Sequence, residues 1–249
     1  MEKKYKTESD PSGLLRIIAL KDFSDVKKGD KGGLIQNEAN LSQEGDCWIY
    51  EDAQVSGNAQ AYGDACILGH ARVSGFAKVY EKAKVFDEAM VGGHARIWGN
   101  VQIGENAKVY GRAQVSENAS IYGSALVHDN AKVYGRAQVF GWTNIYDNVS
   151  VYGEARIGGV IILNRHPRIQ GKIKLWATMY SYIDTSIENN KDYVMLVISD
   201  RNIVVVAKDI TESQISLPSQ TEDITAFTIT ALDYIENVKT IRQLYGEEV

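Results

Sequence analysis

A six-residue alternation of apolar and polar positions runs without interruption through the middle of the chain. DAQVSG, NAQAYG, DACILG and HARVSG follow one another over residues 52–75, and the same phase continues to Gly159 as eighteen hexads. The second position is Ala in fifteen of them, the exceptions being Val101, Thr143 and Val149, and the fourth is almost always Val or Ile. Residues two apart on an extended chain share one side of the pleat, so these side chains are predicted to face one interior.

The sixth position of the hexad predicts a turn in every repeat. It is Gly in twelve hexads and Asp or Glu in six, which suits a bend where a side chain is crowded or must face water. A helix would repeat its apolar stripe every three or four residues, and a hairpin array needs turns roughly 8 to 12 residues apart. Each hexad is therefore predicted to be one short strand and one turn of a solenoid.

The extent of the repeat sets the size of the predicted solenoid. The phase reaches back to Cys47 and Ile49 and, less regularly, forward to Leu175, which gives 22 aliphatic slots from Ile49 to Leu175. Three flat faces per coil is the known arrangement for a hexapeptide period. The 22 slots then correspond to about seven coils, or roughly 34 Å of strands stacked about 4.8 Å apart. The predicted interior is narrow, dry and filled.

The Ala-x-Val and Ala-x-Ile hexads resemble those of the hexapeptide-repeat superfamily, over about half of the chain. This resemblance implies a left-handed parallel β-helix, frequent assembly as trimers and, in many members, acyltransferase activity with coenzyme A. The segment Leu14 to Ser42, followed by GDCWIYEDAQVSGNA, also resembles the leading segment of poorly characterised hexapeptide proteins of phages and prophages. That second likeness implies a phage or prophage source and assigns no function.

The sequence divides into three predicted parts: an N-terminal cap at 1–46, a β-helix at 47–177 and a small C-terminal ββα module at 178–249. A hairpin-like cap is expected because a solenoid otherwise exposes strand edges and open core at its ends. The module is predicted from strands at Val194–Ile198 and Ile203–Ala207, then apolar residues at helical spacing from Ala231 to Tyr245. Capping, subunit contact and partner binding are all open roles for it.

Composition and charge indicate an ordinary globular protein. The 249 residues include 27 Lys plus Arg and 32 Asp plus Glu, for a net charge of -5, so no bulk attraction to nucleic acid or anionic lipid is expected. Two cysteines do not make a disulfide scaffold, and the first thirty residues lack a signal peptide. No uncharged apolar run reaches the roughly 18 residues of a membrane span. We expect a cytoplasmic protein, in the host cell if phage encoded, without membrane association.

Catalytic and metal chemistry are not predicted from the repeat. Residues that stack on one face recur every 18 positions, but His70 and His94 are 24 apart and His128 follows 34 later, so the histidines do not form a metal site. The eighteen hexads also contain no inserted loop of the kind that acyltransferases of the superfamily use. His70 and His94 are better read as hydrated turn residues than as general bases. Cys47 is predicted to fill the core and Cys66 to face outward, and no catalytic residue, metal or cofactor is predicted.

One outward face stands out when positions are sorted by face. Its fifth hexad residues are Tyr62, Tyr80, Trp98, Ser116, Tyr134 and Tyr152. Two residues earlier in each strand lie Gln60, Lys78, Arg96, Gln114, Lys132 and Ser150, and the bends add His94, Arg112 and Arg136. From these we take as candidate ligand-binding residues Lys78, Tyr80, His94, Arg96, Trp98, Arg112, Lys132 and Tyr134.

Three interpretations of this face are compatible with one another. Stacked rings support each other while Lys and Arg stems cover them. Alternatively the face is buried in a homotrimer, since aromatic and Arg residues are enriched at interfaces. The third interpretation is an anionic aromatic ligand, such as a nucleotide, stacked on Trp98 or a Tyr with its phosphate held by Lys and Arg. The superfamily resemblance implies that such a ligand lies between neighbouring subunits.

The favoured functional hypothesis is a non-enzymatic, oligomeric binding protein, most specifically a phage protein that sequesters a nucleotide-type immune signal in intersubunit clefts against host defence. It rests on the uninterrupted coils, the basic and aromatic face and the phage-like leading segment. The first alternative is a coenzyme A-dependent acyltransferase using His94 or His70. The second is a structural or assembly protein of a phage particle, whose protein partner is engaged by residues 178–249.

Overall fold

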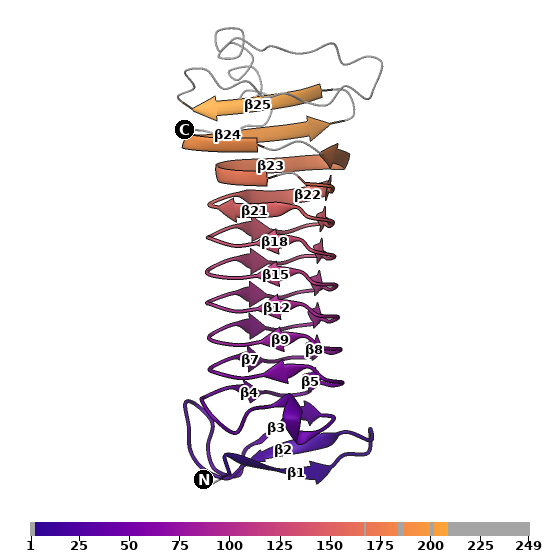
Figure 1. Ribbon diagram of the computed structural model, residues 1–249, viewed down its shortest axis with the longest axis vertical. Coiled ribbons are helices and arrows are strands. Elements are labelled where there is room, and N and C mark those ends of the chain that lie inside the picture. The colour runs from indigo at the N-terminus through magenta and orange to yellow at the C-terminus, as the bar shows by residue number, and fades with distance from the viewer. Residues whose placement is uncertain (1–2, 167, 184–186, 200–201, 209–249) are drawn as a thin grey trace.

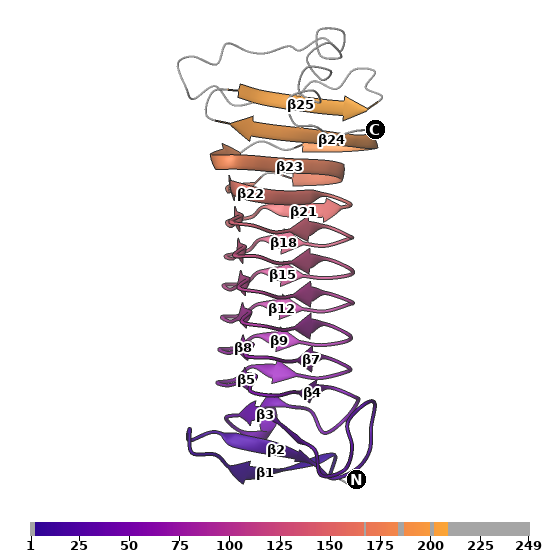
Figure 2. The same cartoon turned by 180° about the vertical axis from the view of Figure 1, so that it is seen from behind.

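The computed structural model describes residues 3–166, 168–183, 187–199 and 202–208. Within them the chain is a β-solenoid of about 8 turns with almost no helix, consistent with the predicted left-handed parallel β-helix. The coils stack as a column, with β1 and β2 at one end and β24 and β25 at the other (Figures 1 and 2). The predicted fold class is therefore confirmed.

The coils present three faces of parallel strands, each strand paired with the strand 18 residues before it. The first face contains β4 (Trp48–Ile49), β7 (Cys66–Ile67), β10 (Lys84–Val85), β13 (Gln102–Ile103), β16 (Ser120–Ile121) and β19 (Gln138–Val139). The second contains β5 (Gln54–Val55), β8 (Arg72–Val73), β11 (Met90–Val91), β14 (Lys108–Val109), β17 (Leu126–Val127) and β20 (Asn144–Ile145). The third contains β6 (Gln60–Ala61), β9 (Lys78–Val79), β12 (Arg96–Ile97), β15 (Gln114–Val115), β18 (Lys132–Val133) and β21 (Ser150–Gly153).

The interior of the coils contains the small and branched residues of the hexads. Ala95, Ile97 and Val115, for example, are fully buried, and the same holds along the whole repeat. The polar exception, Thr143, donates its hydroxyl hydrogen bond to the Phe140 carbonyl at 2.7 Å. Because this bond satisfies the hydroxyl, the inward polar side chain is accommodated in an otherwise apolar core.

The acidic residues at the sixth hexad position have a specific role in the turns. Glu81, Asp87, Glu105, Glu117, Asp129 and Asp147 all adopt positive φ, between 55° and 62°, where Gly is otherwise preferred. Several of these carboxylates accept a hydrogen bond from the turn of the next coil, as in Gly123 N–H to Glu105 Oε2 at 2.8 Å. A bond of this kind offsets the strain of the left-handed conformation, which explains why Asp and Glu replace Gly there.

The N-terminal cap consists of β1 (Tyr5–Ser9), β2 (Leu15–Ala19) and β3 (Lys31–Ile35), which pair antiparallel in sequence order. β3 also pairs parallel with β5, and a short 3-10 helix, η1 (Glu38–Asn40), follows it. β3 is therefore both the last strand of the cap and a strand of the first coil. This double role explains why the solenoid has one turn more than the repeat alone predicted.

Longer strands close the other end: β22 (Arg156–Leu163), β23 (Arg168–Ile183), β24 (Ile187–Ser199) and β25 (Asn202–Lys208). β23 and β24 run parallel, and β24 pairs antiparallel with β25. The antiparallel pair matches the predicted strands of the C-terminal module, whereas its predicted helix at 231–245 lies outside the described residues. The predicted boundary at 177/178 falls inside β23, and the division into domains stays a prediction.

Candidate functional site

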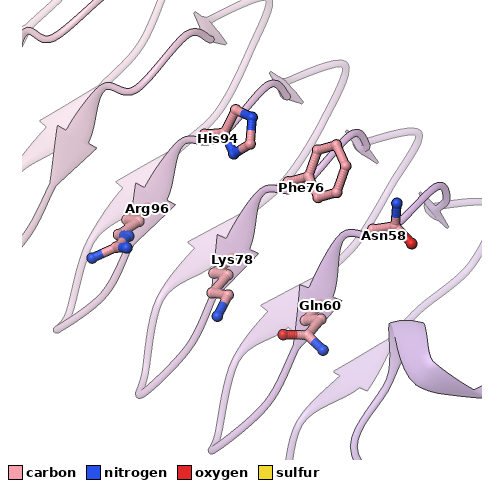
Figure 3. Close-up of a pocket in the computed structure, with 6 residues that line it drawn as sticks. All are labelled: Asn58, Gln60, Phe76, Lys78, His94 and Arg96. Atoms are coloured by element: carbon pink, nitrogen blue, oxygen red, sulfur yellow. The ribbon is translucent and has the colours of Figure 1, made fainter.

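An open depression of about 500 Å³ lies on the third face, over β6, β9 and β12. Its residues form two rows, one from the corner before each strand and one from the first position of the strand (Figure 3). The corner row is Asn58, Phe76 and His94, and the strand row is Gln60, Lys78 and Arg96. Because the coils repeat every 18 residues, three successive coils contribute one residue each to both rows.

The corner row provides a flat aromatic wall. The rings of Phe76 and His94 are stacked, with centroids 4.8 Å apart and planes 3° apart. Phe76 is 53% exposed, unusual for a large apolar side chain among the described residues. The stack holds the imidazole in one orientation beside the basic row, and it leaves apolar ring surface open to solvent.

The strand row places two cations side by side without a counterion. Lys78 and Arg96 are direct Cα partners in the parallel register. Neither charged group forms a hydrogen bond or ion pair with any residue in the described part of the chain. Like charges directly opposite each other on neighbouring strands repel, so this pair creates a local positive potential that an anion would relieve.

The aromatic ladder next to the depression consists of rings that stack on one another. The centroids of Tyr62 and Tyr80 are 4.8 Å apart, those of Tyr80 and Trp98 5.8 Å, and those of Tyr134 and Tyr152 4.7 Å. Burial raises the pKa of the Tyr62, Tyr80 and Tyr134 hydroxyls, so they stay neutral at physiological pH. Tyr80 has a ring on each side, which leaves no free face there for a ligand. Mutual support therefore accounts for most of the ladder.

The predicted ligand-binding residues fall into three places on this face. Lys78, His94 and Arg96 meet in the depression. Arg112 occupies the same corner position as His94, one coil further along. The others flank the depression within the ladder or lie beyond it: Tyr80 and Trp98 follow Lys78 and Arg96 in their coils, whereas Lys132 and Tyr134 lie two coils past Arg96 and Trp98.

Sequence reasoning missed Asn58, Gln60 and Phe76 as lining residues. The hexad pattern places Gln60 in the outward row, and Asn58 and Phe76 at the corner that precedes each strand of this face. The first hexad position, taken every 18 residues, gives Asn58, Phe76, His94 and Arg112. This series places the corner residues of the depression in one row. The 18-residue spacing therefore applies to the turns as well as to the strands.

The remaining candidate groups lie away from the depression. Cys47 is buried and Cys66 half-buried, both are free, and burial raises the pKa of both thiols, in agreement with the predicted core filler and outward thiol. His128 stacks on Tyr146 with centroids 5.1 Å apart. Among the residues that the structure describes, no group of three or more His, Cys, Asp and Glu side chains could hold a metal ion. Over the same residues, no helix has the length and apolar character to cross a membrane.

Fold and site together define a parallel β-helix of hexapeptide repeats with one basic and aromatic face. No protein-family model matches the chain. Over 54 residues it is 46% identical to the uncharacterized acetyltransferase YdcK of Escherichia coli strain K12, a match that spans 19% of this chain and 17% of that protein. The match and the solenoid fit the hexapeptide-repeat β-helix superfamily. The expected phage source and the sequestration of an immune signal find no support in these comparisons.

Proposed function

We propose that the protein binds an anionic, nucleotide-type ligand in the depression on the third face, and that binding rather than turnover is its function. The observation that carries this proposal is the pair of adjacent, uncompensated cations Lys78 and Arg96 beside the stacked rings of Phe76 and His94. Phosphate would neutralise the cations, and the planar group of the ligand would contact the aromatic wall.

The amides in the depression add polarity without charge. Asn58 and Gln60 line the same surface as Lys78 and Arg96, and an amide can both donate and accept hydrogen bonds. A site with two cations, two amides and an aromatic wall matches a ligand that has separate anionic and heteroaromatic parts. The net charge of the chain is -5, so the attraction comes from this patch and not from the average charge.

A homotrimer, the assembly typical of this fold, would complete the site in the proposal. The depression is open on a single chain, and the exposed Phe76 would gain apolar contacts if a neighbouring subunit covered it. The ligand would then lie in an intersubunit cleft. The most specific version of this proposal is that a phage protein sequesters a nucleotide-type immune signal. Identifying a ligand retained by the purified protein tests that version.

Native mass spectrometry of the purified protein, followed by titration calorimetry with AMP, CMP and coenzyme A, tests the proposal. We expect an oligomer that retains or binds such a compound. The double variant Lys78→Gln, Arg96→Gln should lose binding, whereas Arg72→Gln, Lys84→Gln should retain it, because those two cations occupy the same strand position on the other faces. A clean oligomer that binds none of the probes would refute the proposal and favour the assembly role.

Acyl transfer from an acyl-coenzyme A thioester is the second candidate, favoured by the partial match to an acetyltransferase and by His94 in the depression. Coenzyme A contains a phosphorylated nucleotide, so the same cations would hold it. His94 would remove a proton from the acceptor nucleophile, which attacks the thioester carbonyl; the carbon–sulfur bond then breaks and the thiolate leaves and is protonated. Turnover of acetyl coenzyme A that His94→Ala abolishes and His70→Ala leaves intact would establish this function over simple binding.

A further inference from the structure

The depression on the third face is uncharged at one end and basic at the other. Its residues come from three successive coils, and the coil with Asn58 and Gln60 contributes only amides. The next two coils contribute one cation each, Lys78 and then Arg96, and the second of them also contributes His94. The charge of the depression therefore increases along the column, from β6 toward β12 (Figure 3).

Arg112 extends the basic end of the depression by one more coil. It follows His94 in the corner row, and the His94 backbone N–H donates to the carbonyl of Gly111 in the Arg112 turn. Because coils stack about 4.8 Å apart, Arg112 begins one such step beyond a residue that lines the depression. Its side chain is exposed and forms no hydrogen bond or ion pair in the part of the chain that the structure describes. The Arg112 guanidinium is thus available to a second anionic group.

The carboxylates of the neighbouring turns do not pair with Arg112. Asp129 follows it by one coil, and the Asp129 carbonyl accepts the Arg112 backbone N–H at 2.6 Å. The Oδ2 atom of Asp129 lies 3.2 Å from Nδ1 of His128 and accepts the Asp147 backbone N–H at 3.4 Å. Glu117 lies in the turn at the far end of the strand that Arg112 precedes. The basic end of the depression therefore keeps its charge for a ligand.

The strand row is symmetric about its pair of cations, and the corner row is not. Over four consecutive register partners the strand row reads Gln60, Lys78, Arg96 and Gln114. The strand row alone would give a ligand no preferred direction. The corner row breaks this symmetry, because Asn58 precedes Gln60 in its coil whereas Arg112 precedes Gln114. A ligand with one anionic end is favoured with that end toward Arg112.

We propose that the ligand of the depression is a nucleoside diphosphate, with its first phosphate at Lys78 and Arg96 and its second at Arg112. This inference rests on the proposed function and adds the class of the ligand and its direction along the column. A guanidinium suits the second phosphate because its N–H groups bind phosphate oxygens in pairs. The edge of the base then points toward Asn58 and Gln60, whose amides can donate and accept hydrogen bonds.

Calorimetry with AMP and ADP, in the absence of divalent cations, tests the second phosphate. We expect the wild-type protein to bind ADP about tenfold more tightly than AMP, because the second phosphate adds a charge-assisted hydrogen bond. Arg112→Gln should raise the Kd for ADP about tenfold and change the Kd for AMP by less than about threefold. Lys108→Gln removes a cation from the second face of the same coil and should change neither Kd. Thermal unfolding of each variant checks that the coils remain intact.

Two matched variants test the direction of the ligand. Gln60→Glu and Gln114→Glu add the same carboxylate to the strand row, one coil before and one coil after the pair of cations. Because like charges repel more strongly at short distance, Gln114→Glu should raise the Kd for ADP about fivefold more than Gln60→Glu does. An equal or larger effect of Gln60→Glu would mean that the phosphates point away from Arg112, and the inference would be wrong.

The outcomes separate this inference from the proposed function. If the wild-type protein binds neither AMP nor ADP, the proposed function fails and the inference fails with it. If AMP and ADP bind with Kd values within about threefold of each other, the proposed function stands and the second phosphate is refuted. If Arg112→Gln still prefers ADP to the same degree as the wild type, the second phosphate lies elsewhere, which overturns the role assigned to Arg112.

Discussion

The N-terminal cap and the third face of the β-helix use their basic side chains in opposite ways. In the cap, Lys4 is 1% exposed, and its ammonium donates to the Gly45 and Cys47 carbonyls at 3.1 and 2.9 Å. On the third face, Lys78 and Arg96 are exposed neighbours without such partners. The cap uses cations to satisfy carbonyls at the open end of the core, whereas the face keeps its cations available.

Arg16 extends the comparison within the cap. Its guanidinium donates to the Gly32 and Glu51 carbonyls at 3.0 and 3.1 Å and lies 3.4 Å from Asp10 Oδ2. These bonds join β2 to β3 and to the first coil. A cation that links three segments stabilises the fold, whereas two adjacent cations without carboxylates do not. The difference separates basic residues that link segments of the fold from those whose charged groups have no partner in the described part of the chain.

Replacing Lys4 should produce the largest loss of stability. Lys4→Met leaves buried carbonyls without their donor, and we expect it to lower the free energy of unfolding by about 2–4 kcal/mol. Lys78→Met, the control on the third face, should change it by less than about 0.5 kcal/mol. Urea unfolding followed by circular dichroism measures both. Equal losses in the two variants would contradict the division between structural and free cations.

Replacing Arg16 should have a smaller effect in the same direction. Arg16→Gln removes hydrogen bonds to two carbonyls and partly exposed ion pairs with Asp10 and Asp52, so we expect a loss of about 1–2 kcal/mol. Arg96→Gln should not destabilise the protein, because it removes repulsion from Lys78. Thermal melting of both variants at low ionic strength makes the comparison. A lower melting temperature for Arg96→Gln would show that this guanidinium has a structural role.

The affinity for AMP should depend on salt concentration, because the cations of the third face are exposed. Because the proposed site relies on exposed cations, raising the ionic strength from about 0.01 to 0.15 M shortens the Debye length from about 30 to 8 Å. The Kd for AMP should rise several-fold over that range. In Lys78→Gln, Arg96→Gln any residual binding should depend much less on salt, which calorimetry at three salt concentrations measures. A salt-independent wild-type Kd would argue against phosphate recognition by this pair.

The smallest expected effect is the pH dependence of the cap. The Ser12 backbone N–H, the Ser12 hydroxyl and Arg16 hold the pKa of Asp10 below its ordinary value. A lowered folded-state pKa gives stability that is present above the unfolded pKa and is lost as pH falls through the folded one. The melting temperature should therefore drop slightly more in wild type than in Asp10→Asn as the pH is lowered from neutral to about 3. Parallel curves for the two proteins would exclude this contribution.

The sequence predicted the coils well because the hexad restricts each position so strongly. Ala at the second position and Val or Ile at the fourth define the interior, and uninterrupted spacing defines which residues are stacked. The first coil was less visible because Leu34 pairs with Gln54, and Leu41 with Ala61, at an offset of 20 instead of 18 residues. A search for one period does not find a partner two residues out of phase.

The site was predicted only in part. Lys78, His94 and Arg96 were identified from the 18-residue spacing and meet in one depression. Phe76 was missed, and the stacking of Tyr80 between two rings could not be deduced from spacing alone. Spacing gives the coil and the face of a side chain, but its rotamer and its contacts with neighbours decide whether its surface is free.

The sequence by itself determined which residues of the repeat face inward, because a shift that is not a whole number of hexads would turn the Ala and the Val or Ile positions outward. Only the tertiary structure decides which charged groups and aromatic rings remain exposed to solvent and which are covered by neighbouring side chains. Lys4 becomes buried because the cap folds back onto Cys47, a contact between segments that share no repeat. Tyr80 loses both faces of its ring because Tyr62 and Trp98 stack on it from the coils on either side. Such contacts depend on the packing of side chains in three dimensions, which the hexad pattern does not encode.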